Sequence, residues 1–204
     1  MDLRRNLRDQ RHRVLLALAR RGNEDAFRRL YRELFGPVSA YVGRRVPNRE
    51  DAEDVTALVF SRFVHRLDGY DADRGSVMTW VLTMARTAVI DQHRRRRPAA
   101  EPVDELADRL AGPGPGPLQE CVRDEDLRRV RRLLERQPDD IREMFALRFE
   151  QGLRVHEVAE VMGLSPDAAK QRFARALRRL QLELKDEERG PGPNKGDAPC
   201  ATID

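Results

Sequence analysis

Three groups of charged side chains in this 204-residue chain have the composition and spacing to do chemistry. Four carboxylates lie within residues 50–54, four consecutive arginines occupy 94–97, and basic residues recur through 170–179. Clustered carboxylates are ligands that hard divalent cations prefer, whereas clustered arginines suit phosphate groups and the edges of bases. The helices that position each group decide which of these chemistries is available.

The carboxylates at 50–54 fit the start of a helix. Asn48 is a preferred N-cap residue, and carboxylates in the first turns interact favourably with the positive end of the helix dipole. A metal-dependent enzyme is the alternative, because Asp51 and Asp54 share a helix face. No partner carboxylate or histidine motif stands at ligand spacing, and the histidines are scattered at His12, His65, His93 and His156. We therefore predict no catalytic residue, no metal and no cofactor.

The arginines at 94–97 end the mainly apolar segment "MARTAVIDQHRRRRP", which spans residues 84–98. They have three interpretations: a nuclear address, the end of a helix whose dipole favours cations by about 0.3 to 1 kcal/mol each, or a contact with a polyanion. A nuclear address is the least favoured, because nothing else in the chain is eukaryotic in style. Other motifs in the sequence must distinguish between a helix end and a contact with a polyanion.

The segment "VHEVAEVMGLSPDAAKQRFARALRRL" predicts a helix-turn-helix motif. A first helix is expected at 155–162, with Gly163 at its C-terminal cap. After a short turn, Ser165 is the N-cap of a second helix and Pro166 occupies its first position. A helical hairpin without DNA is the alternative, and the glycine turn followed by a Ser-Pro cap makes it the weaker one.

The second helix of this motif separates apolar from basic residues. Between residues 166 and 182 there are five cations against Asp167, a net charge of 5 − 1 = +4. The preceding helix carries Glu157 and Glu160 instead, so the cations are confined to the helix that would enter a major groove. One face is expected to be apolar and to pack in a core: Ala169, Phe173, Ala176, Leu177, Leu180 and Leu184.

Composition and hydrophobic pattern together predict an all-α protein, which the segments described below divide into two small helical domains. Hydrophobic residues make up 40%, charged residues 36% and aromatic residues 5% of the chain, and no alternating strand pattern of useful length occurs. No apolar run approaches the roughly 20 residues of a membrane span, the N-terminus lacks a secretory signal, and Cys121 and Cys200 suggest neither a disulfide framework nor zinc. We therefore expect a cytoplasmic protein.

The chain divides at its Pro- and Gly-rich segments. We expect an N-terminal extension at 1–22, a helical domain at 23–97, a flexible linker at 98–119 containing "GPGPGP", a second helical domain at 120–188, and a disordered tail at 189–204. In the first domain, Asn23 is expected to cap a helix that Gly36 and Pro37 interrupt. A last helix, beginning near Ser76, carries apolar residues on two sides.

These motifs together resemble the extracytoplasmic-function (ECF) class of bacterial sigma factors, in the sigma-70 family. The resemblance rests on "DAFRRLYRELFGPVSAYVGRRV", "DAEDVTALVFSRFV", "DRGSVMTWVLTMARTAVIDQHRRRR" and "REMFALRFEQGLRVHEVAEVMGLSPDAAKQRFARALRRL", and it covers about residues 23 to 185. It implies a non-enzymatic factor that directs promoter-specific initiation, at stress- or signal-responsive genes. The implied partners are the RNA polymerase core, promoter DNA and an anti-sigma factor.

The resemblance also implies roles for individual residues. Region 2 would bind polymerase through the helix beginning "DAEDVTALVF", where Ala57 and Leu58 replace the usual glutamine and glutamate. Region 2 would also melt and bind the minus-ten box, and Thr87 stands where asparagine is common. Trp80 is expected in the core instead, because it lies on the main apolar stripe of its helix. Region 4 would read the minus-thirty-five box as a duplex. The implied polymerase contacts are Asp51, Asp54, Ala57 and Leu58. The implied minus-ten contacts are Tyr70, Arg74, Thr83, Thr87, Arg94 and Arg95, of which the last two belong to the arginine run that ends at Arg97. The implied minus-thirty-five contacts are Lys170, Gln171, Arg172, Arg175, Arg178 and Arg179.

A freestanding helix-turn-helix regulator is the remaining alternative. It accounts for the second domain and leaves the first unexplained. Tight binding to promoter duplex without polymerase would favour it.

Overall fold

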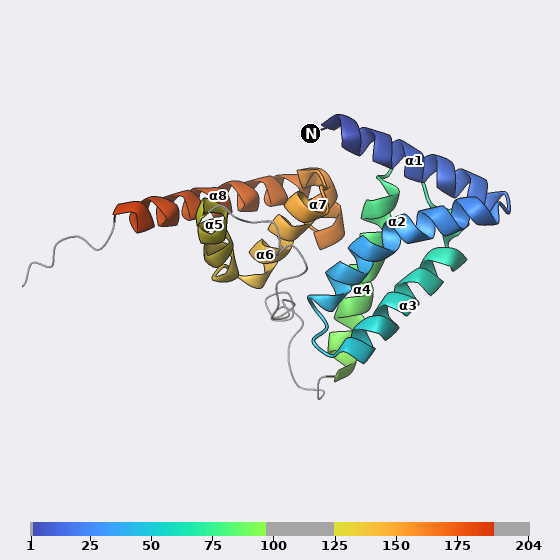
Figure 1. Ribbon diagram of the computed structural model, residues 1–204, viewed down its shortest axis with the longest axis horizontal. Helices are drawn as coiled ribbons and strands as arrows, with labels where there is room; N and C mark the ends of the chain where they lie inside the picture. The colour runs from blue at the N-terminus through green and yellow to red at the C-terminus, as the bar shows by residue number, and fades with distance from the viewer. Residues whose placement is uncertain (1, 97–124, 190–204) are drawn as a thin grey trace, which may run out of the picture.

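The computed structural model describes residues 2–96 and 125–189 (Figure 1). The predicted linker at 98–119, Arg97 and residues 190–204 of the predicted tail lie outside these ranges. No strand occurs in either described range, so the all-α prediction is confirmed. The elements are α1 (Asp2–Arg20), α2 (Glu24–Gly43), α3 (Arg49–His65), the short 3-10 helix η1 (Leu67–Gly69), α4 (Val77–Arg96), α5 (Glu125–Glu135), α6 (Asp139–Phe145), the π-helical turn η4 (Ala146–Glu150), α7 (Val155–Met162) and α8 (Pro166–Arg189).

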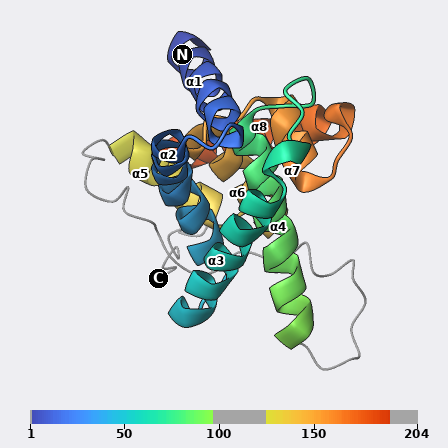
Figure 2. The ribbon, with the colours of Figure 1, turned by 90° about the vertical axis from the view of Figure 1, so that its right-hand side faces the viewer.

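The helices form two bundles that lie side by side. Figure 1 shows α1–α4, the N-terminal bundle, on one side and α5–α8, the C-terminal bundle, on the other. The bundles meet where α4 packs against α7, and the turned view in Figure 2 shows α7 beside the upper part of α4. This contact explains why α4 is apolar on two sides: Val81, Leu82 and Val89 are all completely buried.

Local capping starts the helices where the sequence predicts. The Asn23 side chain accepts a hydrogen bond from the Ala26 backbone N–H at 2.9 Å, and Asn48 accepts one from the Asp51 N–H at 3.1 Å. Ser76 does the same for α4, accepting from the Thr79 N–H at 3.1 Å. Each cap satisfies a donor that the first helical turn leaves unpaired.

The expected interruption at Gly36 and Pro37 is wrong. Helix α2 runs without a break from Glu24 to Gly43, with Pro37 inside it. A proline in a helix interior costs about 3 kcal/mol, because one backbone hydrogen bond is lost and the ring crowds the preceding turn. Leu34 and Val38 on either side of it are completely buried, so the continuous apolar stripe of α2 offsets that cost.

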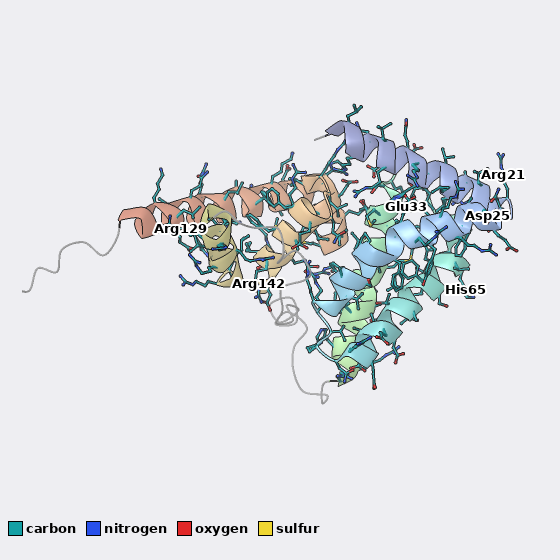
Figure 3. All side chains as sticks on the ribbon, in the orientation of Figure 1. Arg21, Asp25, Glu33, His65, Arg129 and Arg142 are labelled. Carbon is teal, nitrogen blue, oxygen red and sulfur yellow. The ribbon has the colours of Figure 1, made fainter. Side chains whose placement is uncertain are left out.

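Helix α1 has no counterpart among the sequence-based expectations, which place only an extension at 1–22. It packs on α2 through His12 and Leu16, each 1% exposed, and through Leu15. His12 faces the Glu33 carboxylate, with Nε2 3.2 Å from its nearest oxygen, and Figure 3 shows Glu33 where α1 lies along α2. Only two consecutive leucines and one histidine mark the buried side of α1, which is too short a pattern to predict tertiary packing.

The helix-turn-helix prediction is confirmed in detail. Helix α7 ends at Met162, Gly163 adopts the left-handed conformation with φ 68°, and the Ser165 hydroxyl accepts a hydrogen bond from the Ala168 N–H at 3.2 Å. One core assignment on α8 is wrong: Leu177 is 37% exposed, whereas Ala169, Phe173, Ala176 and Leu180 are buried. At about 100° of helix rotation per residue, Leu177 lies at the edge of the strip that these four buried residues define.

Candidate polymerase and nucleic-acid surfaces

The predicted duplex-reading face lies along the exposed side of α8. Helix α7 and the Gly163 turn fix the start of α8, and the buried residues Ala169 and Phe173 turn the opposite side outward. Arg175 is exposed and donates to the Gln171 backbone carbonyl of its own helix at 3.4 Å. The structure brings five predicted residues together on this side, all exposed: Lys170, Gln171, Arg175, Arg178 and Arg179.

Arg172 differs from the other predicted contacts on α8. Its guanidinium lies 3.1 Å from the Asp140 carboxylate of α6, and its side chain is 41% exposed. This ion pair joins α8 to α6 within the C-terminal bundle. A phosphate contact by Arg172 therefore competes with an internal partner, whereas Lys170 is held only by an exposed contact of 3.7 Å to Asp167.

The C-terminal half of α4 presents the second predicted DNA surface. The Thr87 hydroxyl is exposed and donates to the Thr83 carbonyl at 3.0 Å, while Thr83 donates to the Thr79 carbonyl at 2.9 Å. Arg94 and Arg95 are exposed at the end of the helix. Since these hydroxyls satisfy only backbone carbonyls of their own helix, their oxygens can still accept a hydrogen bond from a ligand.

Tyr70 does not present an aromatic face in this structure. It is 8% exposed, its hydroxyl donates to the Gly75 carbonyl at 2.8 Å, and its ring packs on Trp80 with centroids 5.4 Å apart. Burial raises the pKa of the Tyr70 hydroxyl. Arg74, four residues later, is exposed. Trp80 also contacts Phe63 at 5.7 Å, which agrees with its predicted place in the core.

The predicted polymerase contacts line one side of α3. Asp54 and Ala57 are exposed, and Leu58 is half-buried against the core. Asp51 forms an ion pair with Arg96, the third residue of the arginine run. The structure thus joins two of the charged groups that the sequence presents separately. Among the described residues no group of three or more His, Cys, Asp or Glu side chains is placed to hold a metal ion.

Two buried carboxylates at the bundle junction escape sequence analysis. Glu143 of α6, 4% exposed, accepts a hydrogen bond from the Tyr41 hydroxyl at 2.5 Å. The guanidinium groups of Arg45 and Arg86 each lie 3.6 Å from the same oxygen. Burial raises the pKa of the Tyr41 hydroxyl well above its ordinary value.

The second of these carboxylates is Glu157 of α7. One oxygen accepts from the Thr79 hydroxyl at 3.2 Å, and the other accepts from the Arg154 backbone N–H at 2.7 Å. Arg5 of α1 forms an ion pair with it. A glutamate inside an apolar helix stripe is the one sequence signal that could have indicated either contact, and it does not identify a partner.

The chain matches two known domain families in the order that the sequence predicts. Residues 30–99 match Sigma-70 region 2, and residues 127–180 match Sigma-70, region 4. RNA polymerase sigma factor CnrH of Cupriavidus metallidurans is 32% identical over 180 residues, which cover 84% of this chain and 93% of CnrH. The chain therefore belongs to the sigma-70 family, a family of transcription initiation factors that are not enzymes.

Further relatives carry the ECF name. ECF RNA polymerase sigma factor BldN of Streptomyces coelicolor is 34% identical over 179 residues, covering 86% of this chain and 66% of BldN, so the chain spans just under two thirds of that relative. A solved structure of CnrH in complex with the cytosolic domain of CnrY matches 86% of this chain and 98% of that chain, with a TM-score of 0.57 and 26% identity. The resemblance to the ECF class is confirmed.

None of the described helices is both long enough and apolar enough to cross a membrane.

Proposed function

We propose that this chain is an ECF sigma factor that binds core RNA polymerase in the cytoplasm and directs initiation at promoters of stress- or signal-responsive genes. The observation that carries the proposal is the order of region 2 and region 4 on one chain, with the exposed basic face of α8 in the second. A freestanding regulator would need only the helix-turn-helix. We assign residues 23–97 to region 2, 98–119 to the linker and 120–188 to region 4.

We assign polymerase binding to α3. Asp54 and Ala57 are exposed, and Leu58 is half-buried at the edge of this surface. Asp51 takes part once its ion pair with Arg96 opens, which frees a carboxylate and an arginine together. The absence of the usual glutamine and glutamate at Ala57 and Leu58 makes this contact more apolar than is usual in the family.

We assign the minus-ten strand to α4 and the loop before it. Separated strands expose bases that a protein holds in pockets or on aromatic faces while cations contact the backbone. Arg94, Arg95 and Arg74 are exposed and suit phosphate contacts, while Thr83 and Thr87 offer hydroxyls to bases. Tyr70 is assigned to this site only after the 70–76 loop rearranges, because its ring is covered here.

We assign the minus-thirty-five duplex to α8. Lys170, Gln171 and Arg175 face base edges, where bidentate arginine and glutamine contacts distinguish base pairs. The cations flanking them, Arg172, Arg178 and Arg179, suit phosphates and set register and salt dependence.

An anti-sigma factor is the proposed regulatory partner. The supporting observation is that CnrH, similar to this chain over most of its length, is solved in complex with the cytosolic domain of CnrY.

Run-off transcription on genomic DNA with purified core polymerase tests the proposal and identifies the promoters together. We expect transcripts that depend on this chain and share two boxes upstream of their starts. Absence of any dependent transcript, or tight promoter binding by the chain without polymerase, would favour the freestanding regulator.

A further inference from the structure

Helix α1 is fixed to the N-terminal bundle by its second half. His12 and Leu16 are 1% exposed against α2. Arg20 donates to the backbone carbonyls of Leu67 and Tyr70, both at 2.8 Å, and Arg13 donates to the Ala72 carbonyl at 3.0 Å. These contacts anchor α1 on the same loop region that leads into α4.

The first half of α1 reaches the C-terminal bundle. Arg5 forms an ion pair with Glu157 of α7, and Arg8 donates to the Gln151 carbonyl at 3.1 Å. From the other side, the Arg154 guanidinium donates to the Asn6 side chain at 3.0 Å. One helix therefore joins its own bundle to the C-terminal bundle through an ion pair and hydrogen bonds. Figure 1 shows the N-terminal end of α1 above α7.

The Arg5 contact matters most because both partners are shielded from water. The side chains are 10% exposed for Arg5 and 5% for Glu157. Removing one member of a shielded ion pair leaves the other charge unpaired, which is far more costly than losing a surface ion pair. Opening the two bundles restores water to Glu157, so loss of Arg5 favours the open arrangement.

The closed arrangement places α7 against the end of the loop that precedes α4. A side chain at Gly75 would begin 3.1 Å from the Glu160 carboxylate of α7, so α7 lies directly against Gly75, just before α4 begins. Glu160 itself is exposed; partial desolvation raises the pKa of its carboxyl, and the nearby Arg74 opposes that shift. Promoter boxes centred about 25 base pairs apart are separated by about 85 Å along the duplex, at about 3.4 Å per base pair. Helices α4 and α8 cannot read both boxes while α4 and α7 are packed together.

We propose that α1 is an intramolecular strap that holds the two bundles in a closed, DNA-incompetent arrangement through Arg5, Asn6 and Arg8, and that promoter engagement requires release of these contacts. The inhibitory part of this proposal rests on the proposed function, because only a sigma factor needs α4 and α8 apart. The strap itself is a property of the free chain.

Distance measurements on the full-length chain test the strap directly. Fluorescent labels are placed at Ser61→Cys on α3 and Gln181→Cys on α8, both exposed, with Cys121 and Cys200 replaced by serine. The test variant is Arg5→Ala with Arg8→Ala. The matched control, Arg11→Ala with Arg21→Ala, removes the same charge from the same segment at exposed positions that do not contact the C-terminal bundle.

For the unsubstituted chain and the control, we expect a single population with efficient energy transfer between the two labels, as in the closed arrangement. In the test variant the ratio of open to closed molecules should rise on the order of tenfold or more, as for loss of a shielded charge-assisted contact. Arg5→Lys with Arg8→Lys should restore much of the closed population, since the charges return. Equal distances in all four proteins, or an open unsubstituted chain, would overturn the proposal; circular dichroism checks that each variant keeps its helices.

Transcription assays separate this proposal from the proposed function. If the strap inhibits, the test variant should start transcripts at a lower ratio of chain to core polymerase than the control does. If the bundles of the test variant separate but transcription does not increase, α1 still holds the bundles together, and its inhibitory role is rejected. Failure of every protein, including the unsubstituted chain, to support initiation contradicts the proposed function, while the distance measurements still decide whether α1 closes the bundles.

Discussion

Helices α4 and α8 both carry side chains that we propose contact promoter DNA, but they lie in different surroundings. The basic face of α8 is open along its length, with Arg175 and Arg179 exposed. Helix α4 is exposed only toward its C-terminal end, whereas α7 and α1 pack against it; residues 71–74 of the loop before it stay exposed. Tyr70, 8% exposed, is the clearest example of the difference.

The surface on α8 can therefore bind DNA as it stands, whereas the surface on α4 and its preceding loop needs a rearrangement first. A duplex-reading helix works as a rigid body, so α8 can be complete in the free chain. A site that holds separated bases must compete with base stacking and stays closed until DNA is present. The buried carboxylates at the bundle junction connect the two surfaces, and the strongest tests of the comparison act there.

Replacing Glu143 should have the largest effect. Glu143→Ala leaves Arg45, which is 6% exposed, and Tyr41 without their carboxylate partner, and breaking a buried ion pair costs about 3 to 5 kcal/mol. We expect the closed population to be lost in the label-distance measurement described for α1. The control is Glu150→Ala, which removes a junction carboxylate that is 30% exposed and pairs with Arg44; its cost should stay within about 1 kcal/mol. Equal effects would show that burial does not set the strength of the junction.

Substitutions on α8 should come next and should differ in kind. Arg175→Ala should cost about 1 to 3 kcal/mol of binding to the minus-thirty-five duplex and relax its sequence preference, because a base contact is lost. Arg179→Ala should weaken all sequences alike and reduce the slope of log affinity against log salt by about 1. Titrations of the polymerase complex on matched and mismatched duplexes measure both. Indistinguishable effects on specificity would contradict this division between base and phosphate contacts.

The turn before α8 offers a smaller test with an opposite-sign control. Gly163 has φ 68°, a conformation that costs an L-residue roughly 1 to 2 kcal/mol, so Gly163→Ala should lower stability by about that amount. Gly36 lies inside α2 with open space around it, so Gly36→Ala should raise stability by about 0.5 to 1 kcal/mol. Urea unfolding followed by circular dichroism compares them. Two changes of the same sign would show that backbone conformation does not decide the outcome.

Acid should weaken the anchor of α1 by the smallest amount. Burial is the main reason that the pKa of His12 is lowered from 6.5, although Glu33 opposes the shift. The unfolded chain therefore takes up a proton at a higher pH than the folded chain does. Stability attributable to neutral His12 is present above about pH 6.5 and is lost as the pH falls toward the lower folded pKa.

Melting temperatures at pH 7.5 and 5.5 check this sign. His12→Gln should reduce the loss on acidification, because the group that titrates is gone. His156 is exposed and its pKa is also lowered by burial, so His156→Gln is the matched control and should leave most of the loss in place. A larger reduction in the control than in His12→Gln would contradict the assignment.

Features set by neighbouring residues are the ones that sequence reasoning predicted well. The Asn23 and Asn48 caps, the Gly163 turn and the Ser165 cap each depend on a hydrogen bond or dihedral angle within about three residues. The two-sided packing of α4 was also predicted, because apolar residues on opposite faces require two partners. The outward placement of the α8 cations follows from the same periodicity.

Features that depend on distant residues were not predicted. Pro37 stays in a continuous α2 because buried neighbours offset its local cost, and Leu177 is exposed because it lies at the edge of the buried strip of α8. Arg96 pairs with Asp51 across 45 positions of sequence, which local patterns cannot indicate. Neither α1 nor its contacts with Glu157 could be inferred from the short apolar pattern at 15–16.

By itself, then, the sequence determined the all-α class, the caps of α2 and α3, the turn of the DNA-reading motif and the family, because caps, periodicity and motif order are local or linear properties. Tertiary structure alone decided that Glu143 and Glu157 are buried between the bundles, and that α1 extends from its own bundle to Glu157 of the other. The physical reason is that the cost of burying a charge depends on which partners the fold brings near, and such partners can stand more than a hundred residues away, as Tyr41 does from Glu143.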